Sequence, residues 1–355
     1  MAIPFGIVFT LDQKCYDNVR KAISVSAGLG HHIFDAIFPV PDHWHATQAA
    51  GFAALLNGVG WHFFKSYRKA TMLDRYNSGL TPDHFSRKMN FNIMYRHLNT
   101  IKLGCTRVRD TCLQKIAQAR ARGGYIDPDV EALVTWNEYV VPVVYDLLQV
   151  VKKCTPSMYM KAVAHFVIVL YMLDRKLYAN AFDFYLRDLL RLKKQNAKFY
   201  DWFMANLNRV AVCLHIEYQH KLLAPFTEHL SERDAGAVDE LICQLPQLRN
   251  ADTHARSYPG LVKPRTNACS LASLVHEEHH VPLWASEAQT TFDRLLSLKP
   301  GRGSSTIVGD TVNSPRFGYY AAKLTRRSAF PCSKFWSKAK TEEGDESGAW
   351  WRGGG

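Results

Sequence analysis

The chain has 355 residues, of which 47% are hydrophobic and 21% charged, so it is long enough to bury one large core or two ordinary ones. This apolar content excludes intrinsic disorder over the whole length. The 44 basic residues exceed the 32 acidic ones by 12, a surplus that favours polyanionic partners such as nucleic acid or an acidic membrane surface.

Helical signals dominate the sequence up to about Lys299. Three predicted helices begin with an N-capping side chain followed by proline, at Thr81, Asp127 and Thr155. In chain order, helices are predicted near residues 14–27, 45–76, 82–102, 105–121, 128–152, 156–173, 175–195, 198–223, 232–245, 269–280 and 284–298. Strand patterns are confined to residues 3–11 and 306–312. The predicted class is mainly α, with a multi-helix, bundle-like body.

Three stretches of this body carry more specific signals. Residues Ala162–Leu173 are apolar nearly all round, which predicts a central helix buried on most sides. Pro142 interrupts the helix predicted over 128–152 and should kink it or split it in two. The segment after Lys176 has one apolar stripe at helical spacing, with basic residues off the stripe. The stripe is Tyr178, Phe182, Tyr185, Leu189 and Leu192, and the basic residues are Arg187, Arg191 and Lys194.

The basic surplus is concentrated after the helical body. In Lys299–Lys340 nine basic residues stand against one acid, a net charge of +8, and frequent glycine and proline disfavour regular helix. Residues 341–355 have a net charge of −3, which leaves +7 for residues 1–298. The sequence therefore predicts a helical body, then a basic irregular C-terminal segment, then an acidic, glycine-rich tail. A division of the body into two subdomains near residues 124–127 is the alternative.

Targeting and redox signals point to an intracellular protein that is not secreted. The first residues lack a basic n-region and a small-residue cleavage pattern, so no secretory signal is predicted. The longest apolar run, Ala162–Leu173, falls short of the roughly 20 residues that cross a bilayer, so no membrane partner is expected. The eight cysteines form no CxxC pair, which is typical of buried thiols in a reducing compartment.

One string matches a metal-binding motif. Residues 276–280 read HEEHH, and in a zinc hydrolase His276 and His280 would bind the metal while Glu277 acts as general base. Glu278 adds a charge inside the motif, and Pro282 is expected to end the helix soon afterwards. We favour a polar helix end and keep the zinc site as the alternative.

Two further groups of potential ligands have structural interpretations. His43 and His45 could bind a metal if a loop brought the nearby His31, His32 and Asp42 to them, but the prolines and tryptophan around them favour a packed turn before a helix. Cys105 and Cys112 share one face of a predicted helix, which favours core thiols. No nucleophile elbow or phosphate-binding glycine loop occurs, so the sequence predicts no catalytic residues and no cofactor.

Basic residues interleaved with aromatic ones are the most persistent feature. Single-stranded RNA binders use cations for phosphates and aromatic faces for base stacking. Such runs occur at 62–69, 316–320 and 334–338, and a predicted helix over 105–122 adds a cationic face. The candidate RNA contacts are Arg302, Arg316, Lys323, Arg326, Arg327, Lys334, Lys338, Arg107 and Arg109. Ordinary solvated faces are the competing interpretation.

The helical body, with the aromatic and basic run Tyr171–Tyr178 at its centre, resembles the coat proteins of partitiviruses, small double-stranded RNA viruses of fungi and plants. The resemblance concerns length, helical character and the missing enzyme motifs; the C-terminal place of the basic segment departs from it. It implies a capsid subunit, found in the virion and the host cytoplasm, that forms homodimers and then a shell around RNA. The alternatives are the zinc-dependent hydrolase and a helical RNA-binding protein that does not assemble.

Overall fold

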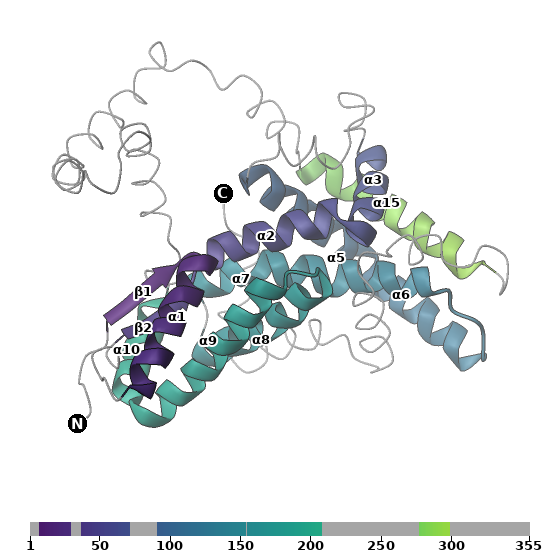
Figure 1. Cartoon of the computed structure of the whole chain (residues 1–355). Helices are drawn as coiled ribbons and strands as arrows, with labels where there is room; N and C mark the ends of the chain where they lie inside the picture. Colours follow the sequence, from purple (N-terminus) through teal and green to yellow (C-terminus); the bar gives the residue numbers. More distant parts are fainter. Residues whose placement is uncertain (1–6, 30–36, 72–90, 154, 208–276, 299–355) are drawn as a thin grey trace, which may run out of the picture.

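The computed structural model describes residues 7–29, 37–71, 91–153, 155–207 and 277–298, and every structural statement below concerns these ranges. Most of them are helical, which confirms the mainly α class. The elements in chain order are β1 (Ile7–Leu11), α1 (Gln13–Gly28), β2 (Ile37–Pro41), α2 (His43–Leu56), α3 (Gly58–Ala70), α5 (Phe91–Ala121), α6 (Pro128–Thr135), the π-helical turn η2 (Trp136–Val140), α7 (Val141–Lys153), α8 (Pro156–Met172), α9 (Lys176–Gln195), α10 (Ala197–Ala205) and α15 (Glu277–Leu296) (Figure 1).

The helices pack around one hydrophobic core. Helix α7 contacts α2, α5 and α8, helix α9 contacts α8 and α10, and α15 lies along α5 (Figure 1). The buried residues of elements before and after residues 124–127 belong to the same cluster. Its largest fully buried side chains include Trp136 and Trp284, whose rings meet edge to face at 6.4 Å. The domain boundaries predicted after residue 298 lie outside the described residues.

A two-stranded parallel sheet lies at the end of the molecule formed by α1 and α10 (Figure 1). Strand β1 confirms the described part of the strand predicted over 3–11, whereas β2 was not predicted because prolines suppress the strand signal. Asp42 donates its N–H to the Leu11 carbonyl across the sheet at 2.9 Å. Because backbone directions alternate along a strand, the nitrogens of Pro39 and Pro41 point away from β1, and no ladder bond is lost.

Two predicted helix boundaries in the first half are wrong. The predicted helix 45–76 is divided into α2 and α3 at Asn57, after which Gly58 takes a positive φ of 50° that favours glycine. Conversely, the helices predicted as 82–102 and 105–121 run together in α5. Gly104 lies inside α5, where an added Cβ would be 2.6 Å from Trp284 Cδ1. This glycine therefore permits the close approach of α15 and does not end a helix.

The predicted interruption near Pro142 is confirmed. Asp127 caps α6 by accepting the N–H of Asp129 at 2.8 Å, and the helix then widens into the π-helical turn η2. Val141 donates its N–H to the Trp136 carbonyl, five residues back, immediately before proline removes the next donor. The turn brings Asn137 and Glu138 toward α5.

The central helices follow the predicted patterns. Between Ala162 and Leu173 no residue of α8 is exposed, and the predicted stripe of α9 faces the core. One later prediction is wrong, because α15 continues through Pro282 where a helix end was expected. The helix predicted over 198–223 is interrupted at Asn206 after α10, and its residues from 208 on lie outside the described structure. Pro282 lies on the exposed side of α15, where water can satisfy the carbonyl that loses its partner. The helix predicted at 232–245 lies outside the described residues.

Candidate functional site

The HEEHH string lies only partly within the described structure. His276 is outside it, and nothing is described of the Glu277 side chain. His279 is exposed while His280 is buried, because consecutive helical residues point in different directions. Among the described residues, no group of three or more His, Cys, Asp or Glu side chains is placed to hold a metal ion. The zinc site remains a prediction.

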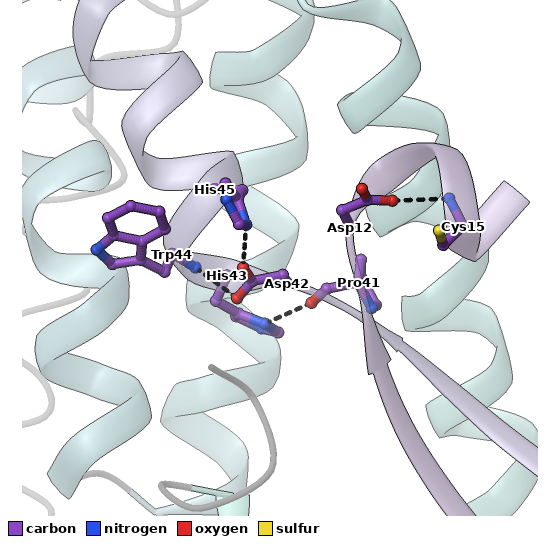
Figure 2. Close-up of polar contacts among 7 residues, drawn as sticks. All are labelled: Asp12, Cys15, Pro41, Asp42, His43, Trp44 and His45. Atoms are coloured by element: carbon purple, nitrogen blue, oxygen red, sulfur yellow. Dashed lines mark hydrogen bonds and ion pairs between the residues drawn. The ribbon is translucent and has the colours of Figure 1, made fainter. Parts of the chain in front are cut away.

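The Asp42–His45 segment forms the packed turn that its sequence predicts (Figure 2). Asp42 caps α2 by accepting the Trp44 N–H at 3.1 Å and also pairs with the His45 ring. His43 is fully buried, with Nδ1 at 2.9 Å from the Pro41 carbonyl and Nε2 at 2.7 Å from the Tyr159 hydroxyl. Its two ring nitrogens hold β2 and α8 together.

Two other histidines also hydrogen-bond tyrosines between elements. His97 of α5 lies 3.1 Å from the Tyr67 hydroxyl of α3, and His165 of α8 lies 2.9 Å from the Tyr139 hydroxyl of η2. Burial lowers the pKa of both imidazoles, that of His97 to about 3. These rings are therefore neutral at pH 7 and hold helices together.

The cations predicted on α5 are engaged to different extents. Arg109 Nε lies 3.0 Å from Glu138 Oε2, so this guanidinium is held in an internal ion pair. Arg107 is exposed on the same helix. Lys115, which shares the helix, pairs with Asp293 of α15 at 2.6 Å. The other candidate contacts, Arg302, Arg316, Lys323, Arg326, Arg327, Lys334 and Lys338, lie outside the described residues.

A small pocket lies where η2 meets α5 and α15. It is lined by Cys105, Val108, Arg109, Cys112, Leu113, Leu133, Val134, Asn137, Glu138, Ala288 and Phe292. Asn137 Oδ1 is buried there without a hydrogen-bond partner. Burial raises the pKa of Glu138 to about 7, against the opposing effect of Arg109. The sequence contained no signal for this pocket, because the π-helical turn sets which side chains line it.

The thiols of this pocket are unreactive. Cys105 and Cys112 are buried and free, as predicted for core thiols. Trp284 donates its indole N–H to the Cys105 sulfur at 3.2 Å. Burial raises the pKa of both thiols, that of Cys112 to about 12, so neither supplies a thiolate at neutral pH. The group that can exchange a proton near neutral pH is the Glu138 carboxyl.

Strand β1 and the end of α1 both expose large apolar side chains. Ile7 and Phe9 of β1 are 54% and 45% exposed, and Val25 and Leu29 at the end of α1 are 63% and 69% exposed. The two elements contact each other, and we call these four residues the β1–α1 face. From Ala22 to Leu29 the chain carries no charge.

Comparison with known proteins assigns no relative. No family model, curated protein or solved structure matches the chain. Within the described ranges, no helix is both long and apolar enough to cross a membrane.

Proposed function

We propose that this chain is a structural subunit that assembles with copies of itself into a shell around RNA. This is the role that the resemblance to partitivirus coat proteins implies, with the virion and the host cytoplasm as its location. The single observation that carries the proposal is the β1–α1 face, four large apolar side chains left in water on two elements that contact each other, because exposed apolar surface of this kind is typical of protein–protein contacts.

The charge of this face favours a second copy as its partner. The whole chain carries +12, so two copies repel each other over most of their surfaces. Strand β1 and the helix end from Ala22 to Leu29 have no charged residue. Two copies can meet through these elements without bringing like charges together.

The free energy expected from burying the β1–α1 face suits a reversible contact. Full burial of a large apolar side chain contributes about 1.5–3 kcal/mol, so the exposed parts of the four residues contribute roughly 3–7 kcal/mol per copy. The contributions of the two copies together are similar in size to the roughly 4–15 kcal/mol that association costs. One such contact is weak, and several contacts per subunit in a closed shell make it stable.

Assembly tests the proposal directly. Purified full-length protein is expected to elute as a large particle, to show particles in negative stain, and to retain nuclease-resistant RNA. The double variant Val25→Glu/Leu29→Glu should lose the particle while its far-ultraviolet circular dichroism stays helical. The matched control, Leu103→Glu/Tyr125→Glu, changes two exposed apolar residues elsewhere and should still assemble.

Each outcome has a distinct meaning. A monomeric wild-type protein free of nucleic acid refutes the shell, and a monomer that binds RNA supports the non-assembling alternative. If the Val25→Glu/Leu29→Glu variant assembles like the control, the β1–α1 face is not the subunit contact.

A further inference from the structure

A basic corner lies where α9 ends and α10 begins. From Arg191 to Tyr200 the chain carries four basic residues and no acid. All four are exposed, and Trp202 on α10 is 49% exposed. We call this surface the α9–α10 corner; its residues are Arg191, Lys193, Lys194, Lys198 and Trp202.

The cations of this corner are weakly engaged. Arg191 reaches Asp188 at 3.5 Å on the surface, and Lys193 Nζ lies over the Tyr200 ring at 5.7 Å from its centroid. Within the described structure, Lys194 and Lys198 make no ion pair or side-chain hydrogen bond. On α5, by contrast, Arg109 and Lys115 both hold carboxylates. The α9–α10 corner therefore leaves most of its positive charge exposed to solvent.

Helix stability does not account for the whole corner. Lys193 and Lys194 lie in the last turn of α9, where cations interact favourably with the helix dipole. Lys198 lies in the first turn of α10, where the dipole disfavours a cation. A lysine at this position lowers helix stability slightly, so an external anion explains it better than the helix does.

Trp202 adds a stacking surface to this charge. Its indole lies against the Phe199 ring at 5.7 Å between centroids and an interplanar angle of 11°, which fixes its orientation. Lys198 and Trp202 are four residues apart, so they are neighbours on the solvent face of α10. Asp201 is the acid on that face.

We infer that the α9–α10 corner binds single-stranded RNA, with its four cations on backbone phosphates and the Trp202 indole stacked on a base. A base inside a duplex is already stacked, so an exposed tryptophan favours unpaired nucleotides. The inference rests on the proposed function in taking RNA as the polyanion. It assigns the contact to residues of the folded body, in addition to the C-terminal basic segment.

The test is fluorescence anisotropy of the full chain with a labelled 20-nucleotide RNA and with a duplex of equal length. We compare wild type with Arg191→Gln/Lys193→Gln/Lys194→Gln/Lys198→Gln. In single strands each phosphate contact adds about 0.7 to the slope of log affinity against log salt. The variant should therefore lose about 3 from this slope and bind at least about tenfold more weakly at low salt.

Two further variants separate specific contacts from general charge. The control Lys14→Gln/Lys21→Gln/Lys65→Gln/Lys69→Gln removes four exposed lysines from other helices and the same net charge. It should bind clearly more tightly than the corner variant. Trp202→Ala should weaken single-strand binding about 5- to 150-fold with an unchanged salt slope, and should leave duplex binding nearly unaffected. Far-ultraviolet circular dichroism confirms that each variant is folded.

The outcomes distinguish this inference from the proposed function. If the corner variant and the lysine control lose equal affinity, or if neither loses any, the inference is wrong while the shell stands. If the corner variant loses binding only to phosphatidylserine vesicles, the partner is a membrane surface and the inference is again wrong. If the wild type binds no RNA and forms no particle, both proposals fail. Particle assembly by the corner variant without bound RNA supports both.

Discussion

Acidification is expected to destabilise the fold through His97. This ring is 2% exposed in the core, where its Nδ1 lies 3.1 Å from the Tyr67 hydroxyl. Burial, together with the nearby His280 and Arg68, which disfavour a further positive charge, lowers its pKa to about 3. The folded protein therefore keeps a neutral imidazole where the unfolded chain binds a proton.

The direction and size of the pH effect on stability follow from this difference in proton binding. Between pH 6.5 and about 3 the unfolded state holds one more proton at His97, so the free energy of unfolding falls as the pH falls. Where the unfolded state holds one full extra proton, the free energy of unfolding changes by about 1.4 kcal/mol per pH unit. Allowing for partial protonation near pH 6.5, His97 should cost about 2 kcal/mol between pH 7 and pH 5.

The assay is urea unfolding of the full chain at pH 7, 6 and 5. His97→Gln keeps an acceptor near the Tyr67 hydroxyl but does not titrate. The wild type should lose about 2 kcal/mol more than this variant between pH 7 and 5. His279→Gln, at an exposed position, should keep the wild-type pH dependence. If the free energy of unfolding changes with pH equally in wild type and in His97→Gln, the reasoning is refuted.

Two packing and charge features give further predictions. The pKa of Glu138 is raised to about 7 from 4.5, so its contribution to stability is lost as the pH rises through that interval. Relative to wild type, Glu138→Gln should therefore gain about 2.5 kcal/mol between pH 5 and 8 in urea unfolding, in addition to a pH-independent loss from leaving Arg109 unpaired; a constant difference contradicts this. Gly104→Ala should lower stability by about 1–3 kcal/mol in thermal unfolding, because its Cβ would strike Trp284. Gly28→Ala, with no atom within 4 Å, is the control, and equal melting temperatures would refute the steric argument.

Local sequence signals predicted the elements whose pattern and packing agree. Helices α8 and α9 appear at their predicted places because capping residues, apolar periodicity and core contacts all favour the same structure. The failures concern glycine and proline, whose effects depend on tertiary neighbours. The gap predicted between residues 102 and 105 is helical, and Gly104 within it makes room for Trp284. Asn57 and Gly58 carried a turn signal that the surrounding apolar pattern concealed.

The candidate surfaces were less accessible to sequence reasoning. Arg191 and Lys194 were expected to be off the apolar stripe of α9, which is confirmed, but this expectation alone assigns them no partner. Their relation to Lys198 and Trp202 depends on the turn between α9 and α10, and no single-helix pattern predicts it. The pocket beside Glu138 similarly depends on a π-helical turn and on a helix far along the chain.

The position of α15 has a consequence for folding during synthesis. Trp284 packs beside Gly104 and donates a hydrogen bond to the sulfur of Cys105, a residue 179 positions earlier in the chain. At synthesis rates of about 5–20 residues per second, roughly 10–35 seconds separate these two partners on the ribosome. Until α15 emerges, the core residues that pack against it are open to water, so a chain truncated before α15 should aggregate.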